Sequence, residues 1–228
     1  MPPALADNGF DSPPAILPVF PLTGSLLLPG NFMPLNIFEP RYRNMVEDVL
    51  ADGGHIGMIQ PLRPGLDQLG MGEDGASLYS VGCAGRLERA ERQDDGRFLI
   101  LLCGVMRFRV ESEVEPRRGY RQVRASYEPF AEDVAADPDG SDPAPLLAAV
   151  ERFGARRDFE FDMDLLASLT GPRLVNALAA ALPFAAAEQQ ALLEAATADE
   201  RQRLLLELMR MEETPPAAAA PFVPPTVN

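Results

Sequence analysis

Few residues in this chain of 228 residues could carry catalytic chemistry. It contains no Lys, so it offers no phosphate-binding Lys of a P-loop, no Schiff-base Lys and no Ser-Lys dyad. Its one His is His55, and its two Cys are Cys83 and Cys103. These numbers are too small for a His-rich or four-Cys metal site and for a disulfide framework. We therefore expect a binding or structural role, with no enzymatic activity, no metal and no cofactor.

The three residues that remain have plain structural interpretations. His55 follows two Gly and opens an expected strand. An uncharacterised hydrolase stays an alternative, but it would need a Ser or Cys beside His55 in space. Cys83 and Cys103 fall on partner strands of an expected hairpin at core-facing positions, where Cys acts as a small hydrophobe. The pattern places no positive group beside either thiol that would lower its pKa.

Two motifs imitate ligand sites but lack the required context. The segment Gly70–Gly75 fits G-x-G-x-x-G, yet a loop precedes it, a strand follows it, and Glu73 and Asp74 would repel a pyrophosphate. Alternating acids further along imitate the start of an EF-hand loop: Asp158, Glu160, Asp162 and Asp164. Met163 stands where that loop needs Gly, and Leu169 where it needs Glu. A solvated turn before a helix explains these acids better than bound calcium, because the helix dipole favours them there.

One stretch concentrates positive charge and makes an RNA-binding module the main alternative. Its members are Arg107, Arg109, Arg117, Arg118, Arg121 and Arg124. Three Glu, at 111, 113 and 115, share a strand face with Arg107 and Arg109 and offset them. The formal net charge of the chain is -14, and it has four Tyr and no Trp. Because phosphate contacts need a net positive surface, we expect weak affinity for nucleic acid.

Short strands and one helix are expected before residue 62. Ile16–Leu22 alternates loosely around two Pro and is predicted to be an edge or irregular strand, and Met33–Phe38 a second strand. Pro40 opens a helix at a position where its missing N–H costs nothing. The apolar stripe of this helix comprises Tyr42, Met45, Val46, Val49 and Leu50. His55–Leu62 is predicted to be the next strand.

A long hairpin gives the strongest strand signal. Leu78–Arg92 and Arg97–Glu115 flank a turn that ends in Asp-Gly, and Tyr120–Pro129 supplies another strand. Apolar residues on both faces predict that the first half of Arg97–Glu115 is buried on both sides and the second half on one. At least six strands around one helix predict a small, partly open β-barrel.

The remaining sequence divides the chain into five parts. They are a disordered start (1–14), the barrel (15–130), an acidic linker (131–145), a helical bundle (146–213) and a disordered tail (214–228). Within the bundle, Thr197–Glu200 forms a capping box that opens a helix. No basic residue precedes Arg41, and the longest apolar stretch, Phe98–Met106, is too short to span a bilayer. We therefore expect a cytoplasmic location with reduced thiols.

Several runs, taken in order, resemble the N-terminal, substrate-binding domain of Lon proteases. They are Leu17–Leu22 (L-P-V-F-P-L), Leu28–Gly30, Pro34–Tyr42 (P-L-N-I-F-E-P-R-Y), Gly104–Phe108 and Gln189–Glu194. The resemblance covers residues 16–212. It implies an α+β fold, a PUA-like barrel followed by a helical bundle. Lon proteases carry an ATPase and a Ser-Lys protease domain after this module. This chain ends before either and lacks the Lys that both require, so it is similar to a standalone bacterial Lon-domain protein.

The resemblance also implies a function. It favours a non-enzymatic module that binds unfolded or exposed hydrophobic polypeptide segments, as an adaptor or regulator of proteolysis, with a protease or chaperone as further partner. Because PUA-like barrels include RNA binders, the RNA-binding alternative stays open. We take Phe32, Leu35, Phe38 and Tyr42, near the Pro29-Gly30 turn, as candidate peptide-binding residues. Simple core packing is the competing interpretation of the same four side chains.

Overall fold

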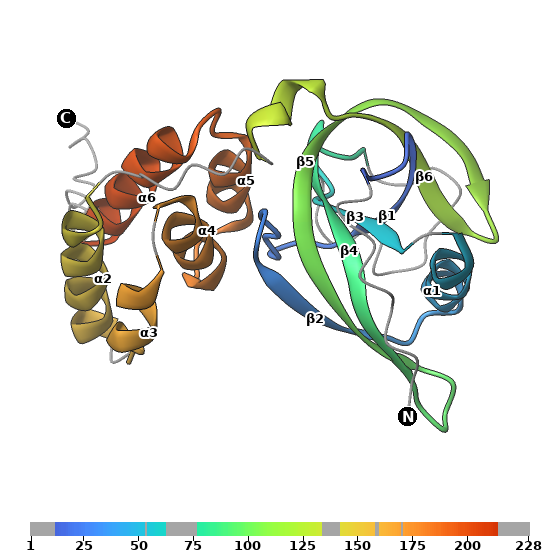
Figure 1. Ribbon diagram of the computed structural model, residues 1–228, viewed down its shortest axis with the longest axis horizontal. Helices are drawn as coiled ribbons and strands as arrows, with labels where there is room; N and C mark the ends of the chain where they lie inside the picture. The colour runs from blue at the N-terminus through green and yellow to red at the C-terminus, as the bar shows by residue number, and fades with distance from the viewer. Residues whose placement is uncertain are drawn as a thin grey trace, which may run out of the picture.

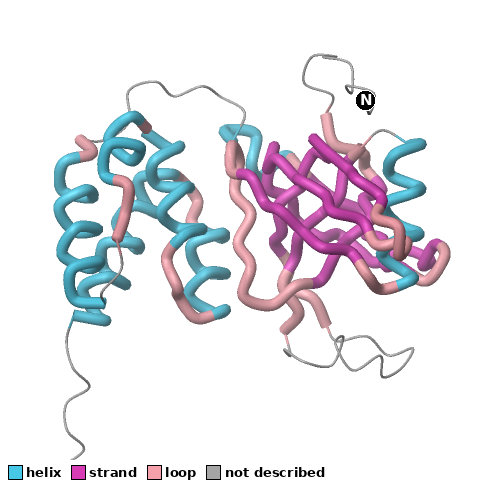
Figure 2. The backbone as a smooth tube through the Cα atoms, turned by 90° about the horizontal axis from the view of Figure 1, so that it is seen from below, coloured by secondary structure: helices cyan, strands magenta, loops and turns pink. Residues whose placement is uncertain are grey.

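The computed structural model describes residues 12–52, 54–62, 77–133, 142–157, 160–169 and 171–213, with the side chains of residues 212 and 213 left aside. Strands and helices gather in two halves that lie side by side (Figures 1 and 2). The predictions of disorder for residues 1–14 and 214–228 lie largely or wholly outside the described residues. So do the Gly70–Gly75 motif and Asp158.

The sheet half is a curled sheet with one helix. Its elements are β1 (Ile16–Pro21), β2 (Phe32–Ile37), α1 (Pro40–Asp52), β3 (His55–Ile59), β4 (Val81–Arg92), β5 (Phe98–Arg117), β6 (Tyr120–Ser126) and the 3-10 helix η2 (Glu128–Asp133). The strand order is β2-β5-β4-β3-β1-β6, and the far end of β5 also pairs with β6. Because β5 is 20 residues long and the β4–β5 ladder carries two register shifts, the sheet can bend round on itself. The prediction of a partly open barrel with one helix is confirmed.

The helical half follows the sheet half in the chain. It contains α2 (Ala144–Arg157), α3 (Met163–Ser168), α4 (Gly171–Ala181), α5 (Ala186–Glu194) and α6 (Ala198–Glu213). Asp162 caps α3 by accepting a hydrogen bond of 2.9 Å from the Leu165 N–H, which agrees with a turn before a helix. Thr197 caps α6 through the Glu200 N–H at 3.1 Å, as the capping-box motif predicts. The predicted α+β class, a barrel and then a bundle, is confirmed.

Of the two alternatives predicted for the first strand, an edge or an irregular strand, the edge position is wrong. β1 pairs in parallel with β3 and antiparallel with β6, and the edge strand is β2. The two Pro of β1 are tolerated because each ladder covers only half of the strand. Pro18 lies opposite Gln122 of β6 but outside the β3 ladder, and Pro21 lies opposite Ile59 of β3 but outside the β6 ladder. Each Pro therefore has one neighbouring strand, and its missing N–H disrupts no second ladder.

The prediction that β5 is first buried on both faces is also wrong. Phe98, Ile100 and Leu102 are buried on the inner face as expected. On the outer face Leu99 is 45% exposed and Leu101 is half-buried. None of the helices that the structure describes covers this face completely, so apolar side chains on it remain in contact with water. The second correction on β5 is Arg107, which is buried rather than on a solvated face.

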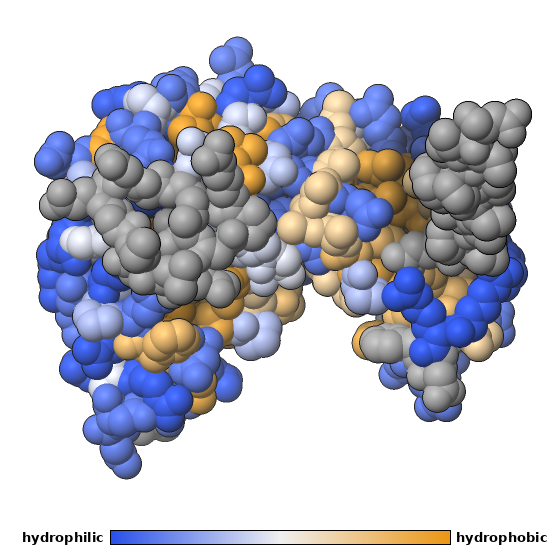
Figure 3. All heavy atoms as spheres, turned by 180° about the vertical axis from the view of Figure 1, so that it is seen from behind, coloured by the Kyte–Doolittle hydropathy of each residue, from blue (hydrophilic) through white to orange (hydrophobic). Residues whose placement is uncertain are grey.

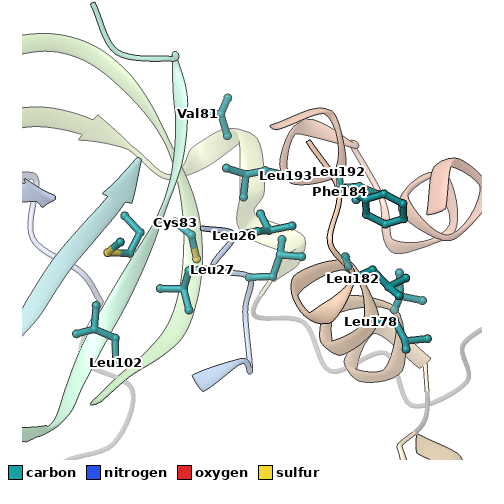
Figure 4. Close-up of a cluster of buried hydrophobic side chains, with 14 of the residues drawn as sticks. Leu26, Leu27, Val81, Cys83, Leu102, Leu178, Leu182, Phe184, Leu192 and Leu193 are labelled. Carbon is teal, nitrogen blue, oxygen red and sulfur yellow. The ribbon is translucent and has the colours of Figure 1, made fainter. Parts of the chain in front are cut away.

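One hydrophobic cluster runs through both halves. It extends from Leu27 and Val81 in the sheet half to Phe184 and Leu193 in the helical half (Figure 4). The predicted boundary at residues 131–145 falls partly in η2 and partly outside the described residues. Since buried contacts cross this boundary, we expect the two parts to unfold together.

This expectation can be tested because the two halves report on different signals. All four Tyr of the chain, Tyr42, Tyr79, Tyr120 and Tyr127, belong to the sheet half, whereas helical circular dichroism reports mainly on the bundle, which holds every α-helix of the described residues except α1. The two signals should change at the same urea concentration. Leu193→Ala should shift both transitions together, by about 2 to 5 kcal/mol of unfolding free energy. Two separate transitions, or a shift of one signal alone, would show that the halves are independent.

Candidate functional site

The four candidate peptide-binding residues do not lie together on one surface. Phe32, the first residue of β2, is 62% exposed, and Phe38, which directly follows the strand, is 63% exposed. Leu35 points to the opposite face of the strand and packs half-buried against the core. Tyr42 is buried, with its ring centroid 4.3 Å from that of Phe20. Tyr42 therefore supports the fold, and Phe32 and Phe38 are the members of the set available to a partner.

The exposed side chains of β2 continue into those of β5. Residues directly opposite each other in an antiparallel pair share a face. The register places Phe32 opposite Cys103, Pro34 opposite Leu101, and Asn36 opposite Leu99. We call the apolar members the outer strip: Phe32, Pro34, Leu99, Leu101 and Cys103. This strip lies along the edge strand of the sheet, where it is open to an added chain.

A groove of about 400 Å³ adjoins the strip between β2 and α4. Its lining residues, the β2–α4 groove from here on, are Gly30, Asn31, Phe32, Leu169, Arg173, Ala177, Ala180 and Ala181. Three Ala on one helix leave the space open, because they carry no more than a methyl group. Seen from behind, the surface is hollowed between the sheet half and the helical half (Figure 3). The groove is thus apolar, with a single cationic side chain, Arg173, on its wall.

The turn before β2 is fixed against α4. Asn31 donates its side-chain amide to the Asn176 carbonyl at 2.7 Å, and Asn176 donates its own to the Pro29 carbonyl at 3.0 Å. Gly30 has a φ of +82°, a conformation that favours Gly. A Cβ on Gly104 would collide with the Leu28 carbonyl, so Gly at that position lets the turn lie directly on β5. These contacts set the position of Phe32 relative to α4.

Arg107 joins the two halves. Its side chain is 3% exposed and forms an ion pair with Asp133 at the end of η2, the closest distance being 2.8 Å. The same guanidinium donates to the carbonyls of Leu193 at 2.9 Å and Ala195 at 2.5 Å, at the end of α5. Its central carbon lies 4.6 Å from the centre of the Phe130 ring. One side chain of β5 thus holds η2 and α5 in place.

Arg201 of α6 caps the same end of α5. Its Nε donates to the Leu192 carbonyl at 2.8 Å, and its Nη1 donates to Asn176 Oδ1 at 2.9 Å. Burial lowers the pKa of Arg201 to about 10, and the nearby charge of Arg107 adds to this effect. Two guanidinium groups at a helix C-terminus are favoured because the carbonyls there carry partial negative charge. Asn176 thereby connects this junction with the turn that positions Phe32.

The predicted arginine concentration is largely neutralised. Arg107 is buried at the junction, and three more are in ion pairs: Arg117 with Asp52, Arg118 with Asp48, and Arg121 with Glu113. A pocket of about 440 Å³ beside Arg107 and Arg201 is lined also by Glu132, Asp133 and Asp199. Phosphate groups would have to compete with these carboxylates, so the geometry does not favour the RNA-binding alternative.

The prediction that both thiols face the core holds for Cys83, which is buried, but is wrong for Cys103, which lies half-buried on the outer strip opposite Phe32. Neither Cys nor His55 shows a sign of an activated side chain. Burial raises the pKa of the Cys83 thiol, and burial is also the main reason that the pKa of Cys103 is raised. His55 is 5% exposed and lies opposite Arg86 in the β3–β4 ladder. Within the described residues, no three His, Cys, Asp or Glu side chains are grouped to hold a metal ion. None of the helices described is both long and apolar enough to cross a membrane.

The ion pair at the junction should contribute strongly to stability. Asp133→Ala leaves the Arg107 guanidinium buried without its counter-charge, which should cost about 3 to 5 kcal/mol of unfolding free energy. Glu132→Ala, next to it in η2 and exposed, is the matched control and should cost less than about 0.5 kcal/mol. Urea denaturation measures both. Equal, small losses for the two variants would remove the junction from this role.

Comparisons with known proteins agree on one family. The model of the ATP-dependent protease La (Lon) substrate-binding domain matches residues 16–211. Lon protease 2 of Myxococcus xanthus is 26% identical over 226 residues, covering 92% of this chain and 25% of that protein. Lon protease 2 of Sorangium cellulosum is 32% identical over 124 residues, covering 53% of this chain and 14% of that protein. The chain spans about a quarter or less of the length of these relatives.

Solved structures give the same result. A Lon N-terminal domain protein from Xanthomonas campestris superposes with a TM-score of 0.58 at 27% identity, covering 84% of this chain and 97% of that chain. The N-terminal domain of the Lon protease of the Mycobacterium avium complex shares the fold, with a TM-score of 0.62 at 17% identity, covering 86% and 98%. The resemblance seen in the sequence is confirmed: this chain belongs to the Lon substrate-binding domain family.

Proposed function

We propose that this chain is a non-enzymatic recognition module that binds extended polypeptide segments with exposed apolar side chains. The observation that carries the proposal is the edge strand β2, which presents Phe32 and the rest of the outer strip beside the β2–α4 groove and is followed by the exposed Phe38. Only unfolded or extended segments can offer both apolar side chains and unpaired backbone groups to such an edge. The substrate-binding role of the family supports the same interpretation.

A connection with proteolysis belongs to this proposal. The matching relatives are Lon proteases, of which this chain corresponds to at most about a quarter. An adaptor or regulator that delivers polypeptides to a protease or chaperone needs a binding surface and no catalytic residues of its own. The cytoplasm, where unfolded chains and Lon-type proteases would meet it, is the compartment we propose.

Exposed aromatic side chains allow a test that leaves the fold intact. Wild-type protein should bind a labelled, permanently unfolded polypeptide with micromolar affinity and its folded parent much more weakly, as measured by fluorescence anisotropy. Phe32→Ser and Phe38→Ser should each weaken binding about five- to tenfold, because each removes an aromatic contact. Met211→Ser on α6 is the matched control: Met211 is 68% exposed, and its loss should not change the affinity.

Measurements of folding alongside binding distinguish a direct loss of contacts at the binding surface from a loss of stability. Variants that keep their circular dichroism spectrum and melting temperature but bind as tightly as wild type would remove Phe32 and Phe38 from the site. A wild-type protein that binds no unfolded polypeptide at all would contradict the proposed function. Tyr42→Ser is unsuitable here, since a buried side chain affects binding through stability.

The absence of Lys leads to a second test. The purified chain should neither hydrolyse ATP nor degrade casein, because both reactions of Lon-type enzymes depend on a Lys. Turnover that disappears on substitution of one of the chain's own residues, rather than on further purification, would contradict the non-enzymatic assignment.

A further inference from the structure

The free edge of β2 has a defined set of backbone groups. β2 pairs with β5 along one edge, and no other described strand pairs with it. Gly104 donates its N–H to the Asn31 carbonyl at 2.8 Å, which sets the phase of this ladder. Since hydrogen-bonding direction alternates along a strand, the backbone groups of Phe32, Pro34 and Asn36 point to the free edge. Pro34 agrees with this phase, because a residue without an N–H fits there without a lost ladder bond.

The edge is closed at its beginning. The turn that precedes Phe32 is held against α4 by the two amide hydrogen bonds between Asn31, Asn176 and Pro29. A chain that extends along β2 towards Phe32 therefore meets α4 and the β2–α4 groove. An internal segment would have to bend away at this point, whereas a chain that ends there fits.

The groove at this closed end carries one positive charge. Arg173 is exposed and takes part in none of the ion pairs found within the described part of the chain. It lines the same groove as Phe32 of the outer strip. Its charge opposes the rise in the pKa of the Cys103 thiol, a rise that burial mainly causes. The nearby carboxylate of Glu88 is already paired with Arg86 at 2.8 Å. The net charge of the chain is -14, so an exposed Arg without an ion pair is a local exception. A carboxylate beside an apolar group would complement this cation and the apolar groove around it.

We propose that the β2–α4 groove binds the C-terminal carboxylate of an extended polypeptide that adds to β2 as an antiparallel strand. An antiparallel strand ends with its C-terminus beside Phe32, where Arg173 can pair with the carboxylate. A parallel strand would place its N-terminal ammonium there, against a like charge. The last apolar side chain fits against Phe32, Ala177 and Ala180. This inference rests on the proposed function and specifies which end of a polypeptide the site reads.

Three peptides of one sequence, with alternating apolar residues, test the inference by anisotropy. The first has a free C-terminal carboxylate, the second a C-terminal amide, and the third an amide with Glu as its last residue. The free-acid peptide should bind about tenfold more tightly than either amide peptide, because only its terminal carboxylate can accept charged hydrogen bonds from Arg173 at this position. Arg173→Gln should abolish the difference between acid and amide, and Arg203→Gln, an exposed Arg of α6, should keep it.

Substitutions that fill the groove provide an independent test of the same inference. Ala181 is exposed on the groove wall, so the large side chain of Ala181→Trp should fill the groove and lower the affinity for the free-acid peptide about tenfold. Ala187→Trp, on the exposed surface of α5, should leave this affinity unchanged. Equal affinity of acid and amide, with unfolded polypeptides still bound, would overturn this inference and leave the proposed function standing. A Glu-amide peptide as tight as the free acid would overturn the terminal assignment. Failure of every peptide and unfolded polypeptide to bind would contradict the proposed function itself.

Discussion

The geometry of this protein depends on a buried guanidinium between its two halves. Arg107 reaches from β5 to Asp133 and to the last carbonyls of α5, so that its N–H donors are matched by acceptors from elements far apart in the chain. A buried charge is tolerated only with such partners, because its transfer from water is otherwise very costly. These contacts therefore fix how the sheet half and the helical half meet.

The candidate binding surface follows from that arrangement. Arg201 shares the end of α5 with Arg107 and holds Asn176, which in turn holds the turn before β2. The chain of contacts runs from the buried charges to the edge strand without interruption. It places Phe32 opposite the Ala face of α4 and leaves the space between them open. Because β2 and α4 are held in place on both sides of the groove, the protein itself loses little conformational entropy when a flexible polypeptide binds. This preorganisation favours affinity.

Local patterns in the sequence predict most of the elements and few of their neighbours. Pro40, the apolar stripe after it, the Asp-Gly turn at Gly96 and the capping box at Thr197 each act within a few residues, and the structure shows these features. Within the stripe the prediction is wrong for Leu50, which is 44% exposed near the end of α1. The position of β1 inside the sheet does not follow from its two Pro, because the split pairing with β3 and β6 is set by strands more than 30 residues away. The stripe that contains Tyr42 is itself a signal that this side chain faces the core, and it outweighs the position of Tyr42 near the Pro29-Gly30 turn.

The residues of the candidate site and of the junction are harder to predict for the same reason. Alternation along β2 separates Phe32 from Leu35 but does not say which face is buried. Arg107 lies in a run of alternating Arg and Glu that is typical of a solvated strand, and its partners are 26 and 86 residues further along. Arg173 belongs to no motif, and its significance comes only from the apolar surface around it.

Our main proposal is that an extended polypeptide adds to the free edge of β2. Amide hydrogen exchange on a complex with an unfolded polypeptide tests it most directly. Exchange at the N–H groups of Phe32 and Asn36 should become slower in the complex. Unchanged exchange at these two groups, with protection elsewhere, would show that the polypeptide does not pair with β2.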